Sequence, residues 1–166
     1  MLTRGLTVTP EHEYLRLDIM PSGRCRHWAR TVDPTFVRLN GRLYKVEAPF
    51  AYDGSSIPPL AWWTLATPLE WPWCYAGAIH DAAYAGALVR VAAANGYMFP
   101  VWFAPVDAHG VFFGILRACG VSSTKAFRAW AGVSIYGALR GHRRSYVPRD
   151  AMAAQFEHLE TFRRAA

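Results

Sequence analysis

The chain has 166 residues, a net charge of +6 at neutral pH and a hydrophobic fraction of 52%. This length fits a single domain, 1–166, with enough apolar material for a core, and the composition excludes disorder over most of the chain. The first five residues lack the apolar run of a signal peptide. Residues 98–116 are apolar, but prolines and Asp107 interrupt them, so the sequence predicts no transmembrane segment.

The positive charge comes mainly from arginine. A basic surface can attract nucleic acid, lipid headgroups or acidic proteins, although a solvated basic surface is the commoner explanation. No recognised nucleic-acid motif accompanies the charge, so a nucleic-acid partner is the weakest of the options. Cys25, Cys74 and Cys119 form neither a metal-binding pair nor a disulfide framework, which suits a reducing compartment.

Residues 1–50 predict β structure. Residues 14–19 alternate with a period of two, and a second strand is expected at about 27–32. The clearest signal is Asn40-Gly41 between the alternating runs 36–39 and 42–46. An Asn-Gly pair supplies the positive φ angles of a tight turn, so a β-hairpin is expected here.

Helices are expected in the rest of the chain. The motif-bearing part, 51–142, predicts helices at about 59–66, 72–88, 103–119 and 122–140, and the segment 143–166 predicts a C-terminal amphipathic helix. Gly120 suits the end of one helix, and Ser122 or Ser123 suits the start of the next. The predicted fold class is α+β: antiparallel strands with a hairpin, followed by a bundle of three to five helices.

Three polar side chains occupy the apolar helix expected at 72–88. His80 and Tyr84 are four residues apart and share one face, and Asp81 is three residues from Tyr84. An unpaired buried polar group costs about 1–3 kcal/mol, so these groups must have partners. Either they form a structural network that holds the helix to the Asp53 loop, or they line a cleft and carry out chemistry.

Two motifs in this order carry a resemblance to a known family. Residues 53–58 read Asp-Gly-Ser-Ser-Ile-Pro, residues 80–84 read His-Asp-Ala-Ala-Tyr, and Gly120-Val121 opens a helical stretch that ends in Leu-Arg-Gly at 139–141. Together they resemble an uncharacterised family, a domain of unknown function found in tailed bacteriophages, prophages and bacteria, over roughly residues 35–142. The resemblance implies a phage protein in the infected bacterial cytoplasm or on the virion, without a known activity.

The His-Asp-x-x-Tyr pattern is also similar, more distantly, to the active-site helix of phospholipases A2. That resemblance implies His80 as general base, Asp81 as a calcium ligand and Tyr84 as a member of the hydrogen-bond network. Asp107, expected on the next helix, would orient the imidazole, and Asp53 would be a second metal ligand. These roles are chemically coherent, because a histidine suits base catalysis near neutral pH and calcium prefers oxygen ligands.

Each of these residues also has a structural explanation. The phospholipase calcium loop is rich in glycine, whereas residues 52–56 contain one. Asp53 suits a turn, and Asp107 suits the first turn of a helix. Two function classes follow: an accessory protein that binds a virion or host protein, and a metal-assisted hydrolase that acts on phospholipid or another ester. The first requires the cluster to be closed by mutual bonds, and the second requires it to open onto a cleft.

Overall fold

The structure is a computed structural model that describes residues 6–20, 28–52, 69–91, 98–101, 103 and 105–139. Its strands are β1 (Val8–Pro10), β2 (Leu17–Met20), β3 (Trp28–Thr31), β4 (Thr35–Leu39), β5 (Arg42–Val46), β6 (Ala51–Tyr52), β7 (Leu88–Val91) and β8 (Met98–Pro100). Its helices are α2 (Trp73–Ala85), α3 (Pro105–Ala118) and α4 (Ser123–Leu139). Antiparallel strands followed by three helices confirm the predicted α+β class.

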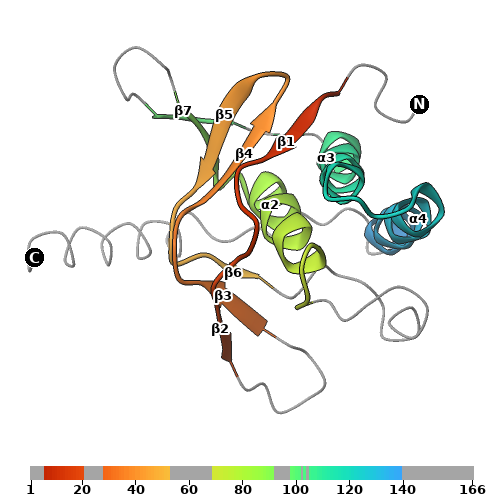
Figure 1. Ribbon diagram of the computed structural model, residues 1–166, viewed down its shortest axis with the longest axis horizontal. Coiled ribbons are helices and arrows are strands. Elements are labelled where there is room, and N and C mark those ends of the chain that lie inside the picture. The colour runs from red at the N-terminus through yellow and green to blue at the C-terminus, as the bar shows by residue number, and fades with distance from the viewer. Residues whose placement is uncertain are drawn as a thin grey trace, which may run out of the picture.

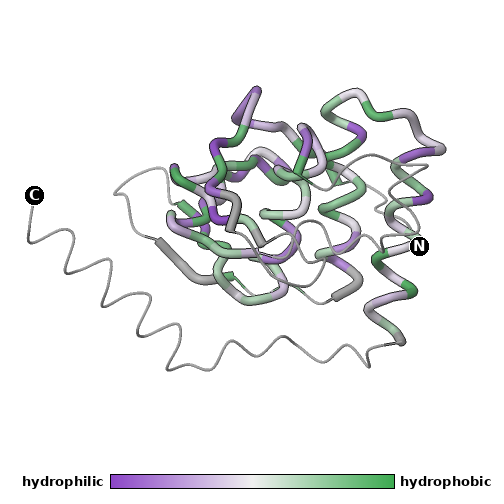
Figure 2. Tube along the Cα trace, turned by 90° about the horizontal axis from the view of Figure 1, so that it is seen from below, coloured by the Kyte–Doolittle hydropathy of each residue, from purple (hydrophilic) through white to green (hydrophobic). Residues whose placement is uncertain are grey.

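The strands form two antiparallel sheets. One has the order β1-β4-β5-β7-β8, and the smaller one has the order β2-β3-β6. Figure 1 shows α2 between the larger sheet and α3, with α4 beyond α3 at the edge of the molecule. Hydrophobic stretches, drawn green in Figure 2, also run along α4.

Helix α2 is buried on nearly all sides. Its small residues pack closely against their neighbours, and four of them are completely buried: Ala76, Ala78, Ala82 and Ala83. A helix that is apolar all round belongs in a core, which explains why α2 sits between a sheet and another helix. From this position α2 contacts β6, β7 and α3.

The predicted hairpin is confirmed. β4 and β5 pair from Thr35↔Val46 to Leu39↔Arg42, and the turn residues Asn40 and Gly41 have φ angles of 51° and 74°. Asn40 also fixes the start of the chain, because its side-chain oxygen accepts a hydrogen bond of 2.8 Å from the Thr7 amide.

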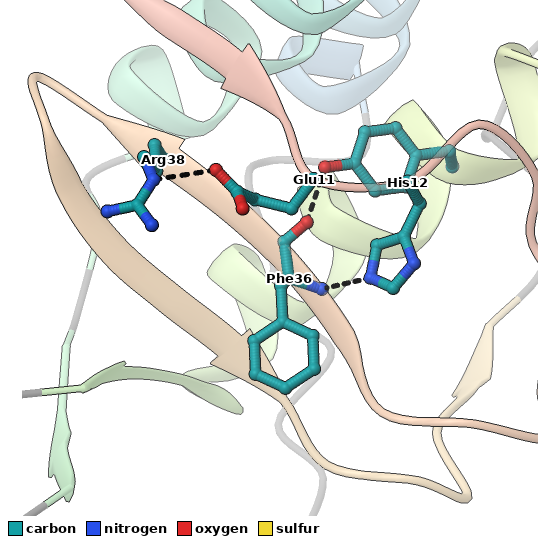
Figure 3. A network of polar contacts seen from close by, with 5 residues as sticks. Glu11, His12, Phe36 and Arg38 are labelled. Atoms are coloured by element: carbon teal, nitrogen blue, oxygen red, sulfur yellow. Dashed lines mark hydrogen bonds and ion pairs between the residues drawn. The ribbon is translucent and has the colours of Figure 1, made fainter. Parts of the chain in front are cut away.

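A polar network anchors both the N-terminal segment and α2 to β4 (Figure 3). Arg38 Nε lies 2.7 Å from Glu11 Oε1, and the Phe36 amide donates to His12 Nε2 at 3.0 Å. The Tyr75 hydroxyl of α2 donates to the Phe36 carbonyl at 2.5 Å. This bond holds α2 at a defined distance from the hairpin and thereby fixes the helix that carries His80.

Two strands lie where the sequence suggested helix or loop. The helix expected at 72–88 ends at Ala85, because Gly86 adopts a left-handed conformation with φ of 71° and stops it. Leu88 and the residues after it then pair with β5 as β7, and Met98–Pro100 pairs with β7 as β8. The helices expected at 59–66 and 143–166 lie outside the described residues.

The other helices lie close to their predicted bounds. The α3 helix ends before Gly120, which has a φ of 85°, and the Ser122 hydroxyl accepts the Lys125 amide at 3.4 Å at the start of α4. Within the part of the chain that the structure describes, no helix is long and apolar enough to cross a membrane.

Burial raises the pKa of the Cys74 thiol to about 11, from an ordinary value of 9.0. Because the folded pKa is the higher one, the stability from this neutral thiol is present below pH 9 and is lost as pH rises towards 11. We expect the free energy of unfolding to fall over this window by at most about 2–3 kcal/mol on account of Cys74.

Chemical denaturation of the wild type and of Cys74→Ala between pH 8 and 11.5 measures this loss. Burial also raises the pKa values of Tyr52 and Tyr75, but both tyrosines are present in both proteins. The difference in slope therefore isolates Cys74. Identical slopes would show that the thiol does not titrate in this range.

Candidate functional site

The centre of the site is His80, whose two ring nitrogens both have partners. On α2, His80 Nδ1 lies 2.8 Å from Asp81 Oδ1, and His80 Nε2 lies 3.0 Å from His109 Nδ1 on α3. His80 is 5% exposed and His109 is 4% exposed, so the contact between the rings is buried. The three side chains form a continuous chain, Asp81–His80–His109, which we call the His-Asp relay.

For a neutral His80, the hydrogen-bond chemistry of the relay assigns one proton to each contact. An ionised Asp81 can only accept, so His80 Nδ1 carries a hydrogen and donates it. In a neutral imidazole the other nitrogen is then an acceptor, so His80 Nε2 accepts the hydrogen bond from His109 Nδ1–H. Each of the two contacts then holds one hydrogen.

Aromatic rings enclose the relay. The Tyr84 ring centroid lies 5.2 Å from that of His80 and 5.6 Å from that of His109, so Tyr84 contacts both. Phe112, which is completely buried on α3, presents its ring edge-on to His80 at 5.6 Å. Burial, and then the charge of Asp81, raise the pKa of Tyr84 above its ordinary value, so Tyr84 is a neutral hydroxyl near neutral pH.

The structure brings together three of the residues singled out from the sequence: His80, Asp81 and Tyr84. Asp107 lies in the first turn of α3 and is exposed, and among the described residues no hydrogen bond joins it to His80. Two residues along an α-helix turn the side chain to nearly the opposite side, so Asp107 faces outward where His109 faces α2. Asp53, the other expected metal ligand, lies outside the described residues.

The sequence did not single out His109. The signal for it is that His109 stands in an apolar stretch of the expected helix. An imidazole buried in such a stretch needs a hydrogen-bond partner, which here is His80.

Tyr52 is a second residue that the sequence did not single out. It ends β6, is 2% exposed, and its hydroxyl has no hydrogen-bond partner among the described residues. Burial, and then the charges of Cys74 and Asp81, raise its pKa above the ordinary value. A buried phenol of this kind normally finds a hydrogen-bond partner.

The relay is capable of two kinds of chemistry. A carboxylate on Nδ1 fixes the tautomer and orientation of an imidazole, which is the arrangement of a general base. The same arrangement satisfies buried polar groups and holds two helices together. It is a poor calcium site, because Asp81 is bonded to His80, and the described residues contain no group of three or more His, Cys, Asp or Glu that could hold a metal ion.

Comparison with known proteins identifies the family. No curated protein and no solved structure matches the chain. A family model with the description "Protein of unknown function (DUF1353)" matches residues 31–133, which span β4 to most of α4 and include every member of the His-Asp relay. The match covers more than half of the chain, and the chain therefore belongs to the DUF1353 family of proteins of unknown function.

Proposed function

We propose that this chain is a phage-associated accessory protein that acts by binding a virion or host protein. In this proposal the His-Asp relay is a structural connection between α2 and α3. One observation carries it: both ring nitrogens of His80 are bonded within the protein, and the His80 side chain is 6% exposed. The protein would act on the virion or in the infected bacterial cytoplasm.

A closed relay argues against turnover because a general base must reach the proton that it removes, directly or through one water. His80 would have to release Asp81 or His109 before either of its nitrogens could act. Breaking such a contact leaves a buried polar group without a partner, at a cost of about 1–3 kcal/mol. As a structural link, the same contacts favour one arrangement of α2 and α3.

The surface supports a binding role. Phe127 and Ile135 of α4 are exposed, and Lys125 and Arg128 lie on the same helix. Protein interfaces are enriched in aromatic side chains and arginine. The net charge of +6 favours an acidic partner surface. Nucleic acid, the third option, has only this charge in its favour.

A second candidate function is hydrolysis of a phospholipid or another ester. It is favoured by a group on the neighbouring helix that bonds to His80 Nε2, because the phospholipase resemblance implies an orienting side chain from that helix. That group is His109 instead of the expected Asp107. The described residues do not fit a calcium ion, so we derive no step through a metal.

Thermal melting with added metal ions separates the two functions. We expect calcium, magnesium, manganese and zinc to leave the melting temperature of the wild type unchanged, and Asp81→Asn to melt lower with or without metal. A metal ion at 10–100 times its dissociation constant would raise stability by about 1.4–2.7 kcal/mol. A rise of this size that Asp81→Asn abolishes, together with ester turnover, would replace the binding proposal with the hydrolase.

A further inference from the structure

Helix α4 has two apolar faces. One packs against α3 through Ala126, Ala129 and Val133, which are 0%, 1% and 2% exposed. On the other side, Phe127 and Ile135 are 48% and 61% exposed, and they are two of the four exposed large hydrophobic residues in the described part of the chain. A helix at the surface of a domain normally presents polar residues to solvent, so the second face of α4 is unusual.

The exposed apolar residues form one stripe. Phe127, Ala131 and Ile135 are spaced by four residues, so they follow one another along a single side of the helix, over about 12 Å. The Trp130 ring lies 5.5 Å from the Phe127 ring and widens the stripe at one end. We call this stripe the α4 face: Phe127, Trp130, Ala131 and Ile135.

The shape of the α4 face suits another helix. Its middle carries no large side chain, because Ala131 is small and the next residue is Gly132. The space beside Gly132 is open, since a Cβ atom added there would meet nothing within 4 Å. Two large side chains separated by small ones form a knob-and-groove surface on which a second helix can pack at an interaxial distance of about 8–10 Å. Helix-in-groove recognition uses this kind of spacing.

The charge around the α4 face has one sign. Helix α4 contains no Asp or Glu, whereas its Lys125 and Arg128 are both exposed. Lys125 and Arg128 flank Phe127 in the sequence. A partner with acidic residues beside its apolar stripe would complement this charge, which speeds association and selects against basic partners.

We propose that the α4 face binds an amphipathic helix of another protein whose apolar stripe is flanked by Asp and Glu. This inference rests on the proposed binding function and names its surface and the chemistry of its partner. A second copy of this chain would bring the same positive charge to the contact. An anionic membrane favours larger apolar side chains than Ala131 in the middle of the face and its neighbour Gly132.

Two synthetic peptides test the proposal on the full chain. Both are amphipathic helices with leucine at i, i+3, i+4 and i+7; one carries glutamate on its flanks and the other carries lysine. We expect the glutamate peptide to bind at least tenfold more tightly than the lysine peptide at low salt, and the difference to shrink as salt is added. Lys125→Glu with Arg128→Glu should reverse the preference.

The apolar part of the contact is tested with Ile135→Ser and Phe127→Ser. Each should weaken binding of the glutamate peptide at least tenfold and lower the melting temperature only slightly, because Phe127 and Ile135 are 48% and 61% exposed. Tyr14→Ser is the matched control, since Tyr14 is 69% exposed and belongs to the segment between β1 and β2, not to α4. It should leave binding unchanged.

Three results would overturn the proposal. The first is an Ile135-dependent dimer in sedimentation, which would make a second copy the occupant. The second is Ile135-dependent binding to phosphatidylglycerol vesicles with no binding of either peptide. The third is no binding of either peptide to the wild type, as expected if residues 140–166 occupied the face. If neither peptide binds and metal ions leave the melting temperature unchanged, the α4 face is not the binding surface. The proposed binding function would then belong to another surface of the protein.

Discussion

Replacing His80 by alanine is expected to lower the free energy of unfolding by about 3 kcal/mol. The change removes both contacts of the His-Asp relay and leaves Asp81 and His109 Nδ1 without the partner that they now share. A buried polar group without a hydrogen bond costs about 1–3 kcal/mol, and the cavity beside Phe112 adds to this. For a chain of this length the melting temperature should fall by about 6–12 °C.

His12→Ala is the matched control for this prediction. His12 is half-buried and accepts one hydrogen bond, from the Phe36 amide at 3.0 Å. Its loss should cost only about 1 kcal/mol. Urea denaturation of the two variants and the wild type measures both values. A His80→Ala protein as stable as the wild type, or more stable, would indicate a residue kept for activity at the expense of stability, as catalytic residues often are.

Phe112→Ala is expected to cost about 3–5 kcal/mol, the largest effect of any change proposed for this protein. Phe112 is completely buried, and its ring contacts His80 at 5.6 Å between centroids. Removing it leaves a cavity that the packed helices can only partly close. It also removes one apolar wall of the relay, so we expect the two histidines to be more accessible to water in this variant.

The adjacent Phe113 supplies the comparison. It lies on the same helix but is only partly buried, so Phe113→Ala should cost about 1–2 kcal/mol. Denaturation midpoints of the two variants, measured side by side, report the difference. Equal losses for the two residues would contradict the packing of α3 against α2 described above.

The sequence predicted those parts of the fold that short-range signals decide. Asn40-Gly41 predicted the turn between β4 and β5, and Gly120 predicted the end of α3, and both are confirmed. The strand β7 was not predicted because its pairing with β5 joins residues more than 40 positions apart. Gly86 is the local signal for the end of α2, and the apolar residues on either side of it continue the pattern of the helix expected at 72–88.

The sequence predicted only those residues of the candidate site that α2 carries. His80, Asp81 and Tyr84 are close because a single helix carries them, and helical spacing is visible in a sequence. The residue of α3 that contacts His80 depends on how α3 is rotated about its axis, and sequence periodicity did not show whether Asp107 or His109 faces α2. In the structure His109 faces α2 and is 4% exposed, whereas Asp107 is exposed to solvent.

Two features link the site to the proposed function. The His-Asp relay fixes α3 on α2, and α3 in turn carries α4 through Ala126, Ala129 and Val133. A buried polar connection can favour one arrangement of helices over others. In this account the relay keeps α2, α3 and α4 in one arrangement, and the α4 face binds the partner.

The most direct test of this account is nitrogen-15 NMR of the imidazole rings, combined with hydrogen exchange at their N–H groups. A closed relay predicts a hydrogen on Nδ1 of both His80 and His109, with both N–H signals visible and protected from exchange with water. His80 Nδ1–H should lose its protection in Asp81→Ala, which removes the acceptor. If instead His80 exchanged its hydrogen freely in the wild type, its ring would be open to solvent, and the structural role of the relay would be contradicted.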